Sequence, residues 1–287
     1  MIISVKIKAT EVKPKSSLGL AQLSPIPVLV KDAPFPIISA QSALVVDIDS
    51  GLALYEKNPE GILLPASTTK ILTALISLEY YPLDTILTVG NVKVAGQKMG
   101  LQFGETITVR DLLKGLLIYS ANDAAEVLAE NYCSQTGCGR DNFIRQMNDK
   151  ARDLSLTHSN FANPSGLENE GHVTSAQDLA RLTSVAMKNS YFREMVGTQK
   201  TNVVSVDGKI VHKLVNLNEL LGKVEGVLGV KTGWTENARE NLVTYVERNN
   251  KKVMMVILGS QDRFGETEEL INWVFENYDW RVVKEPS

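Results

Sequence analysis

Short β-rich runs lie near both ends of this chain, and a long stretch with helical patterning separates them. Residues 43–58 contain two strand-like runs around Asp49-Ser50-Gly51, which is a hairpin signal. Three further β-rich runs follow at 226–235, 240–247 and 251–260. Strands joined by short turns pair in antiparallel fashion. The chain therefore predicts an α/β (α+β) fold, with one antiparallel sheet assembled from both chain ends, flanked by N- and C-terminal helices, and an inserted all-helical lobe.

The length and composition predict a single folded domain preceded by a linker. The chain has 287 residues, of which 44% are hydrophobic, and this suffices for one large core. We expect a sheet lobe at 39–82 and 190–287, and a helical lobe at 83–189. Residues 1–38 are predicted to be an extended linker, because prolines are concentrated there. These prolines are Pro14, Pro25, Pro27, Pro34 and Pro36.

Capping residues and apolar spacing predict where the helices begin and end. A helix that follows residue 70 stops at Pro82. Thr108, three residues before Asp111, is expected to cap a second helix. Thr174-x-x-Gln177 is expected to cap another, and residues 266–278 form the last helix.

Charge, cysteine count and hydropathy exclude several functions. The formal net charge of -3 gives no basic field for a nucleic-acid partner. The three histidines and two cysteines lack metal-ligand spacing, so neither a metal nor another cofactor is indicated. No stretch is long and apolar enough to span a bilayer, and the N-terminus lacks the apolar core of a signal peptide. Cys133 and Cys138 either form a disulfide or remain two thiols.

The first candidate site is Ser67-Thr68-Thr69-Lys70, at the start of a predicted helix. A serine here is an ordinary helix cap, but a lysine in the first helical turn opposes the helix dipole. The spacing of three places Ser67 and Lys70 on one face. A serine hydroxyl becomes a nucleophile when a neighbouring base takes its proton, and a lysine serves if its pKa is lowered. The pattern therefore suits nucleophilic catalysis.

Two further short motifs each have a structural and a catalytic interpretation. Ser120-Ala121-Asn122 lies between two helical segments, where it is a helix break or a polar loop that passes protons and orients a base. Lys231-Thr232-Gly233 lies on a late strand, where it is an exposed strand end or a place for close substrate approach. In the second case Lys231 supplies a cation for a substrate carboxylate and lowers the pKa of Lys70.

The ordered set of three motifs resembles the penicillin-binding D-alanyl-D-alanine carboxypeptidases, relatives of the serine β-lactamases. Longer segments are similar to that family too, and the resemblance covers roughly residues 40 to 280. These segments are PASTTKILTAL, FANPSGLENEGHVTSAQDLARL and NLNELLGKVEGVLGVKTGWTENA. The resemblance implies a serine peptidase that removes the terminal D-alanine from peptidoglycan stem peptides and is acylated by β-lactams. It implies no cofactor or metal.

The resemblance also implies a role for each matching residue. The nucleophile would be Ser67 with Lys70 as its base, and Ser120 would relay a proton to the leaving D-alanine. Asn122 would hold Lys70 and the substrate amide. Lys231 and Thr232 would receive the terminal carboxylate beside Gly233. The backbone N–H groups of Ser67 and Trp234 would form the oxyanion hole.

Some features depart from the family or are open to another interpretation. Relatives often carry Ala-Gly and an aromatic residue where Ala238-Arg239-Glu240 stands, and some carry an arginine at Leu217. Carboxylate recognition therefore depends on Lys231 and Thr232, or on a cation that the sequence does not place. Trp234 lines the cleft or packs in the core. A lone histidine such as His172 is more often structural than catalytic.

Three alternatives to a carboxypeptidase remain at this point. A β-lactamase shares the nucleophile, but the Glu168-Asn169 pair does not match the spacing of the deacylating glutamate in class A enzymes. A non-catalytic domain that binds peptidoglycan or β-lactams is disfavoured by the three intact motifs. An endopeptidase would use the same chemistry. For all of them the family implies work outside the cytoplasmic membrane, with an export signal or membrane tether outside this chain.

Overall fold

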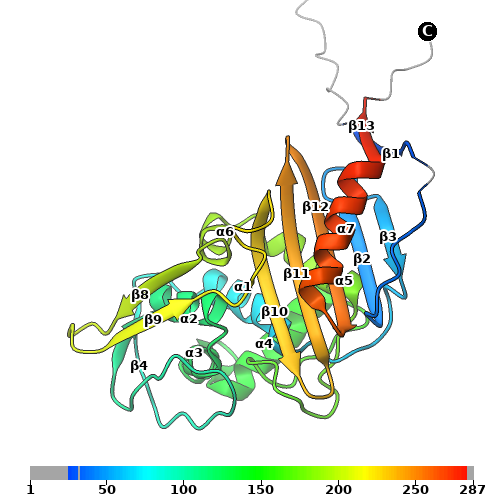
Figure 1. Ribbon diagram of the computed structural model, residues 1–287. Helices are drawn as coiled ribbons and strands as arrows, with labels where there is room; N and C mark the ends of the chain where they lie inside the picture. The colour runs from blue at the N-terminus through cyan, green and yellow to red at the C-terminus, as the bar shows by residue number, and fades with distance from the viewer. Residues whose placement is uncertain (1–24, 32, 283–287) are drawn as a thin grey trace, which may run out of the picture.

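Within residues 25–31 and 33–282, which the computed structural model describes, the central element is a five-stranded antiparallel sheet (Figure 1). Its strand order is β10-β11-β12-β2-β3. The strands are β2 (Ser42–Asp47), β3 (Ala53–Lys57), β10 (Val227–Thr235), β11 (Arg239–Arg248) and β12 (Lys251–Ser260). The sheet therefore joins both ends of the chain, as the sequence predicts, because β12, the last of its strands in the sequence, pairs with the early strand β2.

Alternation along β12 explains why both faces of the sheet are covered. Successive side chains of a strand point to opposite faces. Met254, Val256 and Leu258 enter a core shared with the helical lobe. Val253, Met255 and Ile257 enter a second core, and all six of these side chains are buried. A strand with two apolar faces requires a layer on each side.

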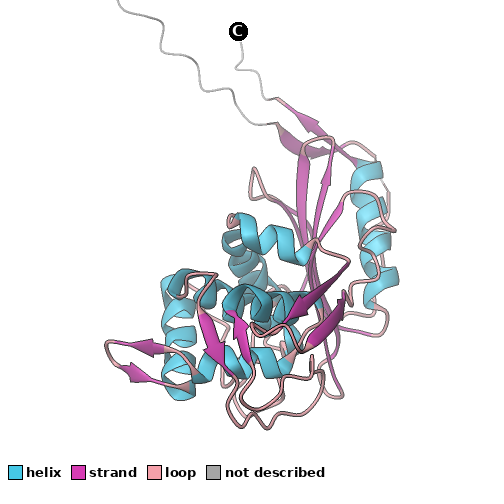
Figure 2. Cartoon of the chain, turned by 90° about the vertical axis from the view of Figure 1, so that its left-hand side faces the viewer, coloured by secondary structure: helices cyan, strands magenta, loops and turns pink. Residues whose placement is uncertain are grey.

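Helices supply these two layers (Figure 2). The last helix, α7 (Arg263–Asn277), packs on β11 and β12 and buries Leu270, Ile271 and Val274 in the second core. On the opposite face α5 (Ala176–Ala186) packs on β12 and β2. The helix that carries the first motif, α1 (Lys70–Tyr80), contacts α5 and the helical lobe. No helix among the described residues is long and apolar enough to cross a membrane.

The inserted lobe is built around α2 (Val109–Ile118), α3 (Asn122–Glu130) and α4 (Arg140–Asp153), followed by α6 (Ser190–Val196). It is not all-helical, which corrects the prediction. It contains the strand pairs β4 (Ile86–Thr88) with β5 (Thr106–Thr108), and β6 (Cys133–Ser134) with β7 (Gly137–Cys138). Strands of two or three residues are too short to show an alternating pattern.

The hairpin of β8 (Lys200–Val204) and β9 (Val211–Val215) corrects the boundary that we predicted at residue 190. It contacts α2 rather than the central sheet and projects beside the helical lobe (Figure 1). Val203 and Leu214 are buried, whereas Val204 and Val211 form an exposed cross-strand pair. The hairpin therefore belongs to the helical side of the molecule.

Two helix starts differ from the sequence analysis by a few residues. Thr108 accepts a hydrogen bond from the backbone N–H of Asp111, which confirms that cap. The cap of α5 is Ser175 rather than Thr174, because its hydroxyl accepts from the N–H of Asp178 at 3.1 Å. The last helix begins at Arg263, three residues before the predicted start, and Asp262 caps it.

Part of the predicted linker is a strand. β1 (Ile26–Leu29) pairs with β13 (Tyr278–Arg281), so the linker prediction is wrong for these four residues. Further along, the carbonyl of Pro34 accepts a hydrogen bond from the indole of Trp273 at 2.9 Å. Residues 1–24, the larger part of the predicted linker, lie outside the described residues.

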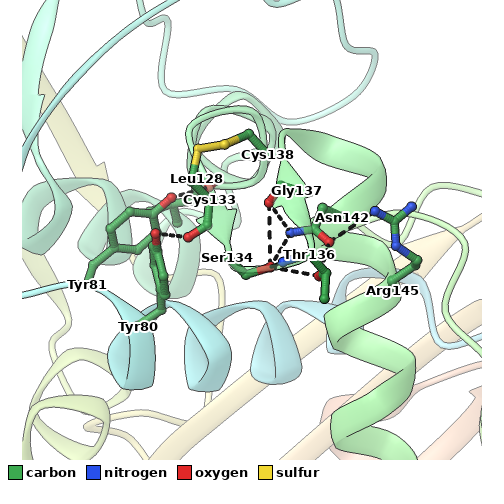
Figure 3. The surroundings of a disulfide bond; sticks show 10 residues. All are labelled: Tyr80, Tyr81, Leu128, Cys133, Ser134, Thr136, Gly137, Cys138, Asn142 and Arg145. Carbon is green, nitrogen blue, oxygen red and sulfur yellow. Dashed lines mark hydrogen bonds between the residues drawn. A yellow bond between two sulfur atoms is a disulfide. The ribbon is translucent and has the colours of Figure 1, made fainter.

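Cys133 and Cys138 form a disulfide, which decides between the two alternatives that the sequence leaves open (Figure 3). The bridge closes a small loop between α3 and α4, and the hydroxyl of Tyr80 in α1 donates to the carbonyl of Cys133. Asn142 of α4 donates to the hydroxyl of Ser134 at 2.7 Å. The loop is therefore tied to α1 and α4.

Candidate active site

The three motifs meet in one cleft between the sheet and the helical lobe. Ser67, Ser120 and Asn122 line it from the helical side, and Thr232, Gly233 and Trp234 line it from β10. The cleft has a volume of about 550 Å³. Residues more than a hundred positions apart in the sequence thus face one space, as expected for a binding site.

A single tight turn brings Ser67 and Lys70 together. Residues Ala66–Thr69 form a 3-10 helix (η1) that continues into α1 at Lys70. Side chains three residues apart eclipse one another in this geometry. The ammonium nitrogen Nζ of Lys70 lies 2.8 Å from the hydroxyl oxygen Oγ of Ser67. The sequence predicts this contact between the two side chains from their spacing.

The surroundings of Lys70 favour its neutral form. Its side chain has no exposed surface, and burial followed by the charge of Lys231 holds its pKa well below the usual value. Besides Ser67, Nζ contacts Asn122 Oδ1 at 2.6 Å and the carbonyl of Ser165. A neutral amine donates two hydrogen bonds and accepts one. Lys70 can therefore donate to Asn122 and Ser165 and accept the proton of Ser67.

Lys231 and Ser120 form a second pair deeper in the site. Lys231 Nζ donates to Ser120 Oγ at 2.9 Å and to the carbonyl of Thr232 at 2.9 Å. Burial, followed by the charge of Arg263, lowers the pKa of Lys231 to about 7. Ser120 has a positive φ of 61°, a conformation that costs on the order of 1–3 kcal/mol for a residue other than glycine. The strained loop holds this hydroxyl against Lys231.

Gly233 allows β10 to approach the nucleophile closely. A Cβ atom at this position would lie 3.2 Å from the backbone nitrogen of Ser67 and 3.1 Å from the carbonyl of Pro65. Even a Cβ atom would therefore require β10 or η1 to shift by a few tenths of an ångström. Trp234, the next residue, is 62% exposed and lines the cleft, so it is not a core residue.

Buried side chains behind the cleft fix the position of η1. Asn241 of β11 donates to the carbonyls of Leu64 and Pro65 at 2.9 and 3.0 Å, and accepts from the N–H of Gly259 at 2.8 Å. His172 contacts the hydroxyl of Thr69 at 2.8 Å. Burial, followed by the charge of Lys70, lowers the pKa of His172 to about 4, so the ring is neutral. His172 therefore has the structural role that we predicted.

Arg263 brings a cation to the cleft from an element in which the sequence predicted none. It is the first residue of α7, lines the cleft, and donates through Nη1 to the carbonyl of Gly233 at 3.0 Å. Its Nε is buried without a hydrogen-bond partner among the described residues. Leu217, where some relatives carry an arginine, lines the same cleft. A guanidinium from a different element thus supplies positive charge there.

Glu168 does not face the nucleophile. Its carboxylate accepts from the backbone N–H of Asn237 at 3.0 Å and from the side-chain amide of Asn237 at 2.6 Å. It lines a neighbouring cavity, whereas Ser67 lines the cleft. Glu168 therefore lacks the placement of a deacylating glutamate, which argues against the β-lactamase alternative. No cluster of potential metal ligands occurs in the part of the chain that the structure describes.

Comparisons with known proteins identify relatives of this chain. A family model described as D-alanyl-D-alanine carboxypeptidase matches residues 30–262. The carboxypeptidase DacF of Bacillus subtilis is 33% identical over 84% of this chain, which spans 63% of that relative. A D-alanyl-D-alanine carboxypeptidase of Mycobacterium tuberculosis is 31% identical, with 84% of each chain covered. The crystal structure of the Streptomyces K15 DD-transpeptidase is 31% identical and covers 85% of this chain and 100% of its own, with a TM-score of 0.77.

Proposed function

Because the chain belongs to the D-alanyl-D-alanine carboxypeptidase family, we propose that it removes the terminal D-alanine from peptidoglycan stem peptides through an acyl-enzyme on Ser67. The observation that carries the proposal is the contact of Ser67 with Lys70, because a fully buried lysine of lowered pKa is a base for a serine hydroxyl. The same nucleophile would be acylated by β-lactams.

Acylation begins when Ser67 Oγ attacks the carbonyl carbon of the penultimate D-alanine and its proton passes to Lys70. The oxygen of the tetrahedral intermediate accepts from the N–H groups of Ser67 and Trp234. The bond to the terminal D-alanine then breaks, and Ser120 relays a proton to the leaving amine from the Lys70–Lys231 network. Water hydrolyses the ester and releases the shortened peptide.

The terminal carboxylate of the substrate would be bound by Lys231, Thr232 and Arg263. Lys231 and Thr232 are buried beside Ser120, and Arg263 reaches the same cleft from α7. A guanidinium presents several donors in a planar fork that suits a carboxylate. Asn122 Nδ2 donates one of its two N–H groups to the carbonyl of Ala95 at 2.8 Å. A hydrogen bond from Asn122 to the substrate amide would therefore use the second N–H group of Nδ2.

We place the protein outside the cytoplasmic membrane. Peptidoglycan lies there, and the disulfide between Cys133 and Cys138 is of the kind that persists in oxidising compartments. A membrane tether outside this chain stays a prediction.

The function is tested by measuring D-alanine release from a pentapeptide that ends in D-Ala-D-Ala. The rate is compared with that for the same peptide with a C-terminal amide. We expect the free acid to react at least about tenfold faster, because the amide cannot form charge-assisted hydrogen bonds with Lys231 and Arg263. Released D-alanine is measured for both peptides under the same conditions. If folded protein releases none from either peptide, the proposal is wrong, and a non-catalytic binding domain explains the site better.

A further inference from the structure

Residues 89–105, which connect β4 to β5, form a long loop without helix or strand. Loops longer than about 15 residues are uncommon in compact domains and usually carry function. Gly96 and Gln97 of this loop line the active-site cleft. The loop is therefore one wall of the site, and contacts with other elements must hold it in place.

The first half of the loop orients Asn122. The carbonyl of Ala95 accepts from Asn122 Nδ2 at 2.8 Å, and the carbonyl of Gln97 accepts from the backbone N–H of Asn122 at 2.7 Å. A Cβ atom at Gly96 would lie 2.8 Å from Asn122 Nδ2, so this close approach requires glycine. With its amide nitrogen held in this way, Asn122 points Oδ1 at Lys70 Nζ, 2.6 Å away.

Two buried side chains hold the second half of the loop. Asp123 of α3 is one of them, and its carboxylate accepts from three successive backbone N–H groups, those of Met99, Gly100 and Leu101. The other is His212 of β9, more than a hundred positions further along the chain. The loop is therefore held from α3 on one side and from the β8–β9 hairpin on the other.

His212 uses both of its ring nitrogens on this loop. Nδ1 lies 3.0 Å from the carbonyl oxygen of Met99, and Nε2 lies 2.7 Å from Glu105 Oε1. The side chains of His212 and Glu105 are 4% and 0% exposed. A carbonyl oxygen only accepts, so Nδ1 donates, and a second proton lies between Nε2 and the carboxyl group. Loss of the ring would leave a buried carboxyl group without its partner, which is costly because no water replaces it.

We propose that His212 is a positioning residue for acylation, which holds loop 89–105 so that its carbonyl groups orient Asn122 towards Lys70. The inference rests on the proposed function, because it concerns the base of that reaction. His212 does not line the cleft, so it acts through the loop. Without His212 the loop keeps its contact with Asp123 but loses its second anchor, and Asn122 Oδ1 no longer has a fixed direction.

The first test compares His212→Leu with Lys213→Leu, a matched control at the next, exposed position of the same strand. The measurement is the second-order rate constant for acylation by a penicillin, determined on the sites that react, whose number is counted separately by intact mass. We expect a rate constant about tenfold lower for His212→Leu, because small displacements far from the chemistry cost this much or more. Lys213→Leu should leave it unchanged. His212→Gln, which keeps a donor near the position of Nε2, should recover it to within about threefold.

A double-mutant cycle tests whether His212 acts through Asn122. In the Asn122→Ala background, which lacks the side-chain amide, His212→Leu should change the rate constant by less than about twofold, because both changes then affect the same contact. If His212→Leu does not fold, His212→Asn takes its place with the same expectations, since its shorter side chain loses the contact with Glu105. Circular dichroism of each variant shows whether the fold is retained.

Each result decides the inference. An unchanged rate constant in His212→Leu, with fewer reactive sites or with all of them, overturns it, because His212 would then contribute to stability alone. A tenfold loss that persists in the Asn122→Ala background also overturns it, because the effect would not pass through Asn122. In both cases acylation of the unchanged protein leaves the proposed function standing. If the unchanged protein forms no acyl-enzyme, the proposed function fails and this inference fails with it.

Discussion

Replacing Lys70 by alanine is expected to lower the rate of acylation by about 10³- to 10⁴-fold, because general-base catalysis contributes up to that much. Lys70 is the first residue of α1 and contacts Ser67 Oγ at 2.8 Å, with no other base so placed among the described side chains. Lys70→Arg should be equally impaired, since a guanidinium stays protonated and cannot accept the proton of Ser67. The measurement is the second-order rate of acylation by a penicillin.

Lys223→Ala serves as the control for Lys70. This lysine is exposed, pairs with Glu219 at 3.5 Å, and should be replaceable without effect on the rate. Circular dichroism of each variant shows whether the fold is retained. A Lys70→Arg protein that folds and reacts at the original rate would contradict the assignment of Lys70 as the base.

The second large effect is expected at Lys231. Lys231→Ala should lower kcat/KM for a substrate with a free C-terminal carboxylate by about 10²- to 10³-fold, in line with the cost of removing one partner of a buried charge pair. The variant also removes the donor to Ser120 and the positive charge that lowers the pKa of Lys70. The loss should be much smaller for a substrate whose terminal carboxylate is amidated.

The pH dependence of the unchanged protein follows from the same two lysines. The pKa of Lys231 in the folded protein is about 7, below its ordinary value, so its positive charge is lost as the pH rises through about 7. Affinity for a carboxylate should therefore fall above that pH. Lys70 must be neutral to act, so acylation should be lost at low pH, below the lowered pKa of Lys70. A profile of kcat/KM that rises steadily up to pH 10 would contradict the role of Lys231.

Local sequence patterns predicted the sheet, the three motifs and most helices, for physical reasons. The hairpin around Asp49-Ser50-Gly51 and the turn at Asn249-Asn250 carry the turn residues that their backbones need, and both asparagines have a positive φ. The contact of Ser67 with Lys70 follows from one turn of helix. Residues three apart in the sequence are brought together by helix geometry, so a contact of this kind can be predicted from the sequence alone.

Contacts between distant elements were not predictable in this way. Arg263 lay outside the helix predicted at 266–278, and its approach to Gly233 depends on how α7 packs on the sheet. Asn241 ties η1 to β11 across 176 positions, and no local pattern marks it. The hairpin at 200–215 was missed although Asp207-Gly208 between two valine-rich runs is a turn signal.

Intact-mass analysis after incubation with a penicillin, on the unchanged protein and on Ser67→Ala, tests most directly that Ser67 is the nucleophile. We predict one lasting adduct on the unchanged protein and none on Ser67→Ala, with both proteins folded. A stable adduct on Ser67→Ala would contradict it, because another residue would then be the nucleophile. The absence of any adduct on well-folded unchanged protein, with the drug intact, would show that the three motifs do not form a working site.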